Sequence, residues 1–414
     1  MSSLVTEKIL PGYSPGLDQQ IGSIATNILE NKNEISGAEL LGGKAGIALL
    51  FAYLSKIFPD RDYLPITFDL LDDLGNSLAN EELGYNMSAG VAGIAFTFQH
   101  LRNIGILDRA EDLDLSAIDE FISSGIENDF AANNWDPLHG MTGLGIYFLE
   151  RYKETNEKKF LEKIVGKLSS MRKEAGEYRV WITPGYQKYS NDNYNFGMAH
   201  GMPGVLSFLA QVHANGIKRS QCEEMISSCL PFLLLHEYEN DSNGIFPNAI
   251  DVEQNGKEQK QGSRLAWCYG DLCMANALIH CGKAMNNNSW KTKGIEIALK
   301  TTQRNFESSG CTDAPFCHGT TGLLHQYNRL FQLTGNEIFK TAAENWTRIT
   351  IEQYYKPGEG AGGYYFRSMN EEKNVFEYIP CYGLLEGSAG IALVYLSWLY
   401  NIEPAWDIIF LTNV

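Results

Sequence analysis

Seven glycine-led segments recur along the chain and constrain its fold more than any other feature. Each has a G-x-x-G or G-x-x-C pattern followed by an apolar, helix-forming run. They are GGKAGIALLFAYL from Gly42, MSAGVAGIAFTF from Met87, LHGMTGLGIYFL from Leu138, AHGMPGVLSFLA from Ala199, CYGDLCMANALI from Cys268, CHGTTGLLHQYN from Cys317 and LEGSAGIALVYL from Leu385. The anchoring glycines of successive segments lie 47 to 69 residues apart: Gly43, Gly90, Gly140, Gly201, Gly270, Gly319 and Gly387. Self-similarity at such intervals indicates a repeat architecture.

A second helix accompanies each glycine-led helix in this pattern. Amphipathic stretches begin at Leu17, Leu115, Lys159 and Gly294, and they carry charged residues on one side. The glycine-led helices are apolar nearly all round and must be buried against neighbours, whereas the amphipathic ones should lie outside. We therefore expect an all-α fold, a double α/α toroid of seven helical hairpins with the glycine-rich turns on one face, as a single domain over residues 1–414. An open superhelical solenoid is the alternative.

Strand signals are sparse and local. EYRVWITP from Glu177 and GGYYFRS from Gly362 stand next to proline or glycine, and we expect them to form loop ribbons. Long loops over 240–263 and 355–380 are expected to rim the mouth of the ring, because loops of this length usually carry function.

The charge balance argues against two classes of partner. The chain has 33 Lys and Arg against 50 Asp and Glu, a net charge of −17, which repels nucleic acid and anionic membranes. The N-terminal sequence MSSLVTEKIL lacks the pattern of a signal peptide, and the longest apolar runs are about half a membrane span. We expect a cytoplasmic protein that binds no nucleic acid and does not span a membrane.

Two of the seven repeats carry residue types that bind metals. Cys268 stands in WCYG, and Cys317 and His318 stand together in FCHG. Two thiolates and an imidazole occupy three positions of a tetrahedral zinc site, and a fourth position left to water or substrate is typical of catalytic zinc. The shared register of the repeats favours their convergence. Because the chain has no C-x-x-C pair, the alternative is that these cysteines are small buried hydrophobic residues.

The same motifs carry a family resemblance. AHG at Ala199, WCYG at Trp267 and CHG at Cys317 each open a glycine-led helix, and with them the chain resembles the lanthionine cyclase (LanC-like) family over nearly its whole length. The resemblance implies a seven-hairpin α toroid with one zinc per chain, held by Cys268, Cys317 and His318. It also implies a reaction: a cysteine thiol of a peptide adds to dehydroalanine or dehydrobutyrine, which forms lanthionine or methyllanthionine.

The implied zinc suits this chemistry. A thiol with a pKa near 8.5 is mostly protonated at pH 7, and zinc coordination deprotonates it. Zinc with two protein thiolates is neutral, so a third thiolate from the substrate makes the centre negative and keeps the bound sulfur nucleophilic.

Addition to the β-carbon leaves an enolate that needs a proton. Until the proton arrives, a positive or hydrogen-bonding group must stabilise its negative charge. His200 in MAHG is the candidate acid, and by resemblance Asp136 in NNWDPLHG belongs to the catalytic set; a carboxylate there would raise the pKa of the imidazole. Arg264 and Tyr269 match family positions near the metal, where they could contact the enolate. The alternative for His200 is a structural histidine at the start of a helix. The alternative for Arg264 and Tyr269 is that they only support their loop.

Five other residues in or near these motifs are assigned lesser roles. Trp267 and Cys273 are expected to pack, and His139 and His325 are expected to be structural. Glu386 fills the equivalent slot in the last repeat, from which it could line the cavity.

These observations give a leading hypothesis and three rivals. The first is a stand-alone zinc cyclase that acts on a dehydrated precursor peptide of leader and core, after a separate dehydratase and alongside an exporter; residues 1–41 leave no room for a dehydratase region. The second is a LanC-like enzyme that adds glutathione to dehydroamino acids in proteins. The third is a non-catalytic scaffold that binds a leader peptide. A glycosidase using Asp136 and Glu386 is weaker, because it leaves the metal-binding residues unexplained.

Overall fold

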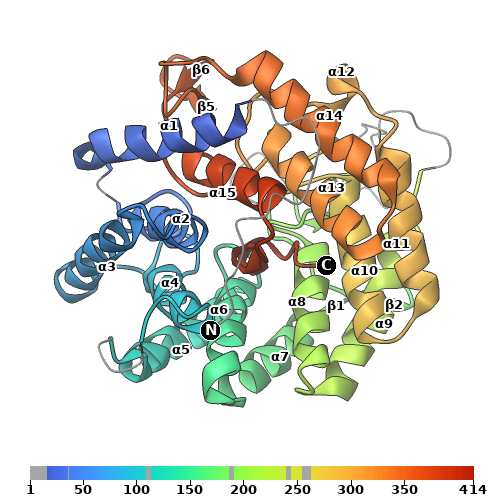
Figure 1. The fold of residues 1–414 in the computed structure, drawn as a ribbon. Coiled ribbons are helices and arrows are strands. Elements are labelled where there is room, and N and C mark those ends of the chain that lie inside the picture. Colours follow the sequence, from blue (N-terminus) through green and yellow to red (C-terminus); the bar gives the residue numbers. More distant parts are fainter. Residues whose placement is uncertain (1–15, 36, 109–112, 186–190, 239–243, 254–262) are drawn as a thin grey trace. The chain divides into compact units, whose positions relative to one another are not determined.

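The computed structural model describes residues 16–35, 37–108, 113–185, 191–238, 244–253 and 263–414. The chain forms two compact units. The first unit combines residues 1–119 with 311–406, and the second combines residues 120–310 with 407–414. Helices are the main secondary structure of both units (Figure 1).

All seven glycine-led helices form, and each begins directly after its anchoring glycine. Nearly all their residues over the first three turns are buried, as expected for helices that are apolar all round. They are α2 (Lys44–Ile57), α4 (Val91–Asn103), α6 (Met141–Thr155), α8 (Met202–Ala214), α10 (Asp271–Ala284), α13 (Thr320–Thr334) and α15 (Ser388–Leu399).

The remaining long helices bury one side only. In α7 the buried residues recur at helical spacing, with Phe160, Ile164 and Leu168 among them, so one stripe faces the core. This group comprises α1 (Leu17–Glu30), α3 (Tyr63–Asn80), α5 (Leu115–Ala131), α7 (Lys159–Met171), α9 (Arg219–Leu234), α11 (Asn288–Thr301) and α14 (Glu337–Tyr354). Short helical turns complete the set: η1 (Lys32–Glu34), α12 (Phe306–Ser309) and η3 (Ala405–Phe410).

Within each unit the helices pack as hairpins side by side. In the first unit the buried helices follow one another in the order α13, α15, α2, α4, and α14, α1 and α3 pack against α13, α15 and α2. Helix α1 is thus the partner of α15, so the first and last of the long helices pack against each other (Figure 1). In the second unit α6, α8 and α10 follow one another, with α7, α9 and α11 as their partners.

The loop before each glycine-led helix explains why glycine stands there. At Gly270 the backbone has φ +130°, which disfavours a side chain, and a Cβ would also clash with the carbonyl oxygen of Arg264. At Gly201 the backbone is extended, but a Cβ would clash with Asn195. The glycines therefore mark places where the preceding loop folds back onto the helix start.

In the described ranges, three antiparallel two-stranded ribbons interrupt the helices. β1 (Lys173–Ala175) pairs with β2 (Tyr178–Val180), β3 (Asn193–Asn195) pairs with β4 (Ala249–Asp251), and β5 (Phe366–Asn370) pairs with β6 (Val375–Ile379). The two ribbons expected from the sequence are confirmed, because β2 lies in the first of those segments and β5 begins in the second. The β3–β4 ribbon was missed, since three-residue strands show no alternation. Part of the long loop at 240–263 lies outside the described residues.

Among the helices of the described ranges, none combines the length and apolar character that crossing a bilayer requires. The expectation of a single domain over residues 1–414 stays a prediction.

Candidate functional site

Cys268 is held in a tightly bonded loop of the second unit. It lies buried, two residues before Gly270, the N-cap of α10. Nη2 of Arg264 donates a hydrogen bond to the Cys268 sulfur over 3.3 Å, and Nε1 of Trp267 donates to the carbonyl of Phe410 over 2.7 Å. A guanidinium and a helix N-terminus both favour a thiolate over a thiol. The loop thus places the Cys268 sulfur beside a guanidinium and close to the N-terminus of α10.

The AHG loop is bonded directly to the loop of Cys268. The backbone N–H groups of Met198 and Ala199 donate to the carbonyl of Cys268 at 3.0 and 3.3 Å. Next along the chain, the ring of His200 lies 6.4 Å from that of Tyr269, centroid to centroid. The motifs of two successive repeats therefore meet within one unit.

His200 and Asp136 form the hydrogen-bonded pair that the sequence predicted. Nδ1 of His200 lies 2.8 Å from Oδ2 of Asp136, and Oδ1 of Asp136 accepts from the N–H groups of Leu138 and His139 at 2.8 Å each. Burial alone would lower the pKa of His200, but the hydrogen bond and charge of Asp136 raise it above its ordinary value. Burial likewise raises the pKa of Asp136, yet the bonds from His200 and His139 lower it overall. This pairing favours the imidazolium and carboxylate forms.

Tyr269 is oriented by a residue that the sequence analysis did not single out. Nδ2 of Asn195 donates to the Tyr269 hydroxyl over 3.1 Å, and Oδ1 of Asn195 accepts from the N–H of Gly197 over 2.9 Å. Burial raises the pKa of Tyr269, so the phenol keeps its proton near neutral pH. With its oxygen accepting from Asn195, the hydroxyl can donate that proton in another hydrogen bond.

Cys317 and His318 lie in the first unit, directly before Gly319, the N-cap of α13. Both are partly exposed. The N–H of Cys317 donates to the carbonyl of Leu385 over 3.1 Å. Oδ2 of the buried Asp313 lies 3.8 Å from Nε2 of His318, which leaves Nδ1 on the other side of the ring.

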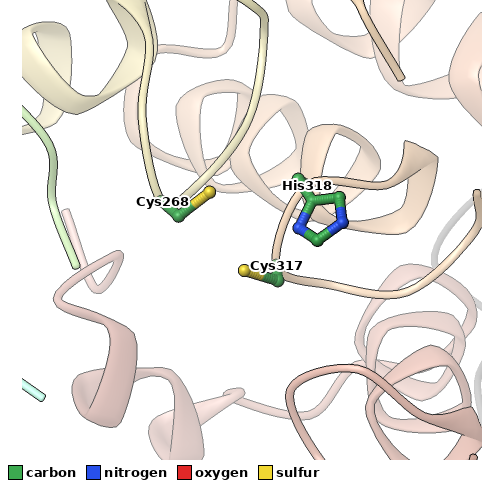
Figure 2. Close-up of side chains that lie close together, drawn as sticks. All are labelled: Cys268, Cys317 and His318. Atoms are coloured by element: carbon green, nitrogen blue, oxygen red, sulfur yellow. The ribbon is translucent and has the colours of Figure 1, made fainter. Parts of the chain in front are cut away.

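Cys268, Cys317 and His318 form the one group of metal-binding side chains found among the described residues. Their ligand atoms, one from each residue, all lie within 4.8 Å of one another, and Figure 2 shows the three side chains gathered together. Tetrahedral zinc with sulfur and nitrogen ligands separates neighbouring ligand atoms by about 3.5 to 3.8 Å. The donor set and its spacing therefore fit zinc, with one coordination position left open.

Two of the residues that were assigned lesser roles are buried. Cys273 is buried and donates to the carbonyl of Trp267, and burial raises the pKa of its thiol. His325 is buried against Phe316 and Trp406.

His139, expected to be structural, stacks on His200 with ring centroids 5.5 Å apart. Burial and the neighbouring His200 lower the pKa of His139, against the charge of Asp136, so it is the neutral ring of the two. Its position in LHG, equivalent to His200 in AHG, was the available signal. Asp313 and Asn195 had none, because each acts through the fold of its own loop.

Comparisons with known proteins find one family of similar sequences and structures. Residues 34–411 match the family model described as Lanthionine synthetase C-like protein. The chain is 24% identical over 408 residues to the Nisin biosynthesis protein NisC of Lactococcus lactis subsp. lactis, covering 90% of this chain and 89% of that protein. A solved structure of Nisin cyclase superposes with a TM-score of 0.75 at 20% identity, covering 96% of this chain and 98% of the other.

The chain belongs to the lanthionine synthetase C-like family. Its fold is the helical toroid of that family, as the match to Nisin cyclase shows. The expected all-α toroid is confirmed, and the open solenoid is excluded.

Proposed function

We propose that this protein is a zinc-dependent lanthipeptide cyclase. It catalyses the addition of cysteine thiols of a dehydrated precursor peptide to dehydroalanine or dehydrobutyrine residues of the same peptide, which closes thioether rings. The observation that carries the proposal is the grouping of two thiols and one imidazole within 4.8 Å in a chain of this family. A non-catalytic scaffold would not need that donor set.

Cys268, Cys317 and His318 would hold the zinc, which when bound supplies a positive charge that lowers the pKa of a substrate thiol. A residue of the second unit strengthens this effect of the zinc charge. Arg264 donates to the sulfur of Cys268, which withdraws negative charge from that sulfur and steadies it as a ligand.

His200 serves as the proton donor of the reaction. Attack of the thiolate on the β-carbon forms the carbon–sulfur bond and moves the electron pair of the double bond to the α-carbon and its carbonyl. The Asp136 carboxylate binds Nδ1 of His200 and favours the imidazolium, so Nε2 can deliver a proton to the α-carbon. Tyr269 donates its phenolic proton as a hydrogen bond to the enolate oxygen until that transfer occurs.

Metal analysis of the purified protein is the first test, because each later step depends on this site. About one zinc per chain, lost in Cys317→Ala, supports the proposal. A wild-type protein that contains no zinc after purification without chelators would refute the proposal.

Product analysis distinguishes the cyclase from its nearest rival. A dehydrated peptide with internal cysteines should lose free thiols without changing mass, in a reaction abolished by His200→Ala. If only added glutathione reacts, the protein is a glutathione-adding enzyme instead. If His200→Ala and Asp136→Asn cyclise like the wild type, the assignment of the acid is wrong.

The proposal also includes a cytoplasmic location and partnership with a separate dehydratase and an exporter. Co-purification with those proteins tests the partnership.

A further inference from the structure

The β5–β6 ribbon of the first unit exposes an unusual amount of apolar surface. Ten large hydrophobic side chains are exposed in the described parts of the chain, and five of them lie in this one hairpin. The five are Met369, Val375, Phe376, Tyr378 and Ile379. Scattered exposed apolar residues are ordinary, but a contiguous group marks an interaction surface.

The strand register places three of these side chains on one face. Residues directly opposite each other in an antiparallel pair share a face, so Arg367, Tyr378, Met369 and Phe376 form one surface, here called the ribbon face. The guanidinium of Arg367 lies 3.5 Å from the centre of the Phe376 ring. This cation–π contact fixes the aromatic ring in an exposed position instead of letting it fold away.

The base of the ribbon is fastened to the loop that carries two of the proposed zinc ligands. The N–H of Arg367 donates to Oδ2 of Asp313 over 3.2 Å, and the Tyr378 hydroxyl donates to the carbonyl of Thr312 over 2.9 Å. The ring of Phe366 lies 6.1 Å from that of His318, centroid to centroid. The base of the ribbon is therefore fixed in position relative to His318.

We propose that the ribbon face and the outer edge of β6 dock the dehydrated precursor peptide by strand addition. This inference rests on the proposed function, since it names where that function's substrate binds. Within the described strands β6 pairs with β5 alone, and four of its five residues are exposed, so we place the extended peptide along its outer edge. Main-chain hydrogen bonds then supply affinity that does not depend on sequence, and side chains of alternate peptide residues rest on the aromatic surface.

The chemistry and dimensions of the ribbon suit such a peptide. Dehydroalanine and dehydrobutyrine have small, apolar, planar side chains without charge, so they match an apolar surface and an extended backbone. A strand rises by about 3.3 Å per residue, so a peptide paired along Val375–Ile379 runs from the hairpin tip to the end beside Phe366. The next few residues of that peptide would reach the neighbourhood of His318.

Peptide binding to ribbon variants tests the proposal. The probe is a fluorescein-labelled peptide of alternating dehydrobutyrine and valine residues without cysteine, titrated with the full-length protein and followed by anisotropy. Phe376→Ser with Met369→Ser should weaken binding about tenfold. Ile338→Ser, an equally exposed apolar residue on α14 of the same unit, is the matched control and should bind as the wild type does. Zinc content and melting temperature of each variant verify that the fold is intact.

A second peptide tests the strand-addition geometry. Methylation of alternate backbone nitrogens removes the donors that pair with β6 but keeps the apolar side chains, so this peptide should bind at least tenfold more weakly. Equal binding of both peptides, or unchanged binding by an intact ribbon variant that holds zinc, would overturn the docking proposal while leaving the zinc cyclase untouched. Lack of zinc in the wild type would overturn the cyclase instead. A dimer that the ribbon variant dissociates would show that a second copy of this chain covers the surface, which also refutes peptide docking.

Discussion

Replacement of Asp313 by asparagine should weaken zinc binding without unfolding the protein. The Asp313 carboxylate lies 3.8 Å from Nε2 of His318, and its side chain is 1% exposed. At that distance and an effective dielectric constant of about 20, a full pair of charges interacts by about 4 kcal/mol. A metal-bound imidazole carries only part of a positive charge, so a fraction of that energy is lost. We expect a decrease in zinc affinity of about 10-fold to 100-fold, or about 1.4 to 2.8 kcal/mol.

Competition with a chromophoric zinc chelator at constant pH measures this change in affinity. Asp73→Asn is the control, because it removes the same charge from the same unit at a residue that pairs with Lys44, 2.7 Å away. Equal urea unfolding midpoints would show that neither variant disturbs the fold. If Asp313→Asn binds zinc within about twofold of the wild type, then Asp313 does not orient His318, and the argument from its position is refuted.

Three further substitutions test the loops around Cys268 and the proposed catalytic pair, and a fourth serves as a comparison. Trp267→Phe should lower the free energy of unfolding by about 1 to 3 kcal/mol, measured by urea denaturation, because it leaves a buried carbonyl acceptor without its donor. Asp136→Asn should move the alkaline limb of the kcat/KM profile to lower pH, because burial lowers the pKa of His200 and the variant removes the Asp136 charge that outweighs this lowering. An unshifted limb would show that another group limits the rate. Gly270→Ala should destabilise the protein by about 2 to 3 kcal/mol in the same denaturation assay, since φ there is +130° and a Cβ would clash. Gly75→Ala, at a helical glycine with open space around it, should instead stabilise it by about 0.5 to 1 kcal/mol.

The helical part of the fold was predictable because two local signals agree. The glycines mark where each buried helix begins, and the apolar run that follows sets its burial on all sides. The partnership of α1 with α15 was not stated from the sequence, because no local feature of Leu17–Glu30 specifies which distant helix it contacts. The β3–β4 ribbon joins segments more than fifty residues apart, and three-residue strands carry too little pattern to reveal such a pairing.

The candidate site was predictable only where a residue type itself carries the chemistry. Thiols and imidazoles are rare and reactive, so Cys268 and His318 could be named from the sequence. Asn195 and Asp313 are common polar residues whose roles arise from what they contact, Tyr269 in one case and His318 in the other. Such roles depend on how a loop folds, and composition does not contain that information.

The loop and glycine that begin each buried helix also explain why the candidate reactive residues lie at the repeats. The loop before each buried helix folds back so closely that a glycine is required at the helix start, and this loop then presents its last residues beside a helix N-terminus. His200 and His318 each occupy the position directly before such a glycine, and Cys268 and Cys317 stand two residues before theirs. Helix N-termini stabilise anionic sulfur, so the second position suits a thiolate ligand. Repeats whose loops lack these residues, such as that of Gly43, keep the glycine for packing alone, which shows that the fold needs the glycine whether or not a reactive side chain precedes it.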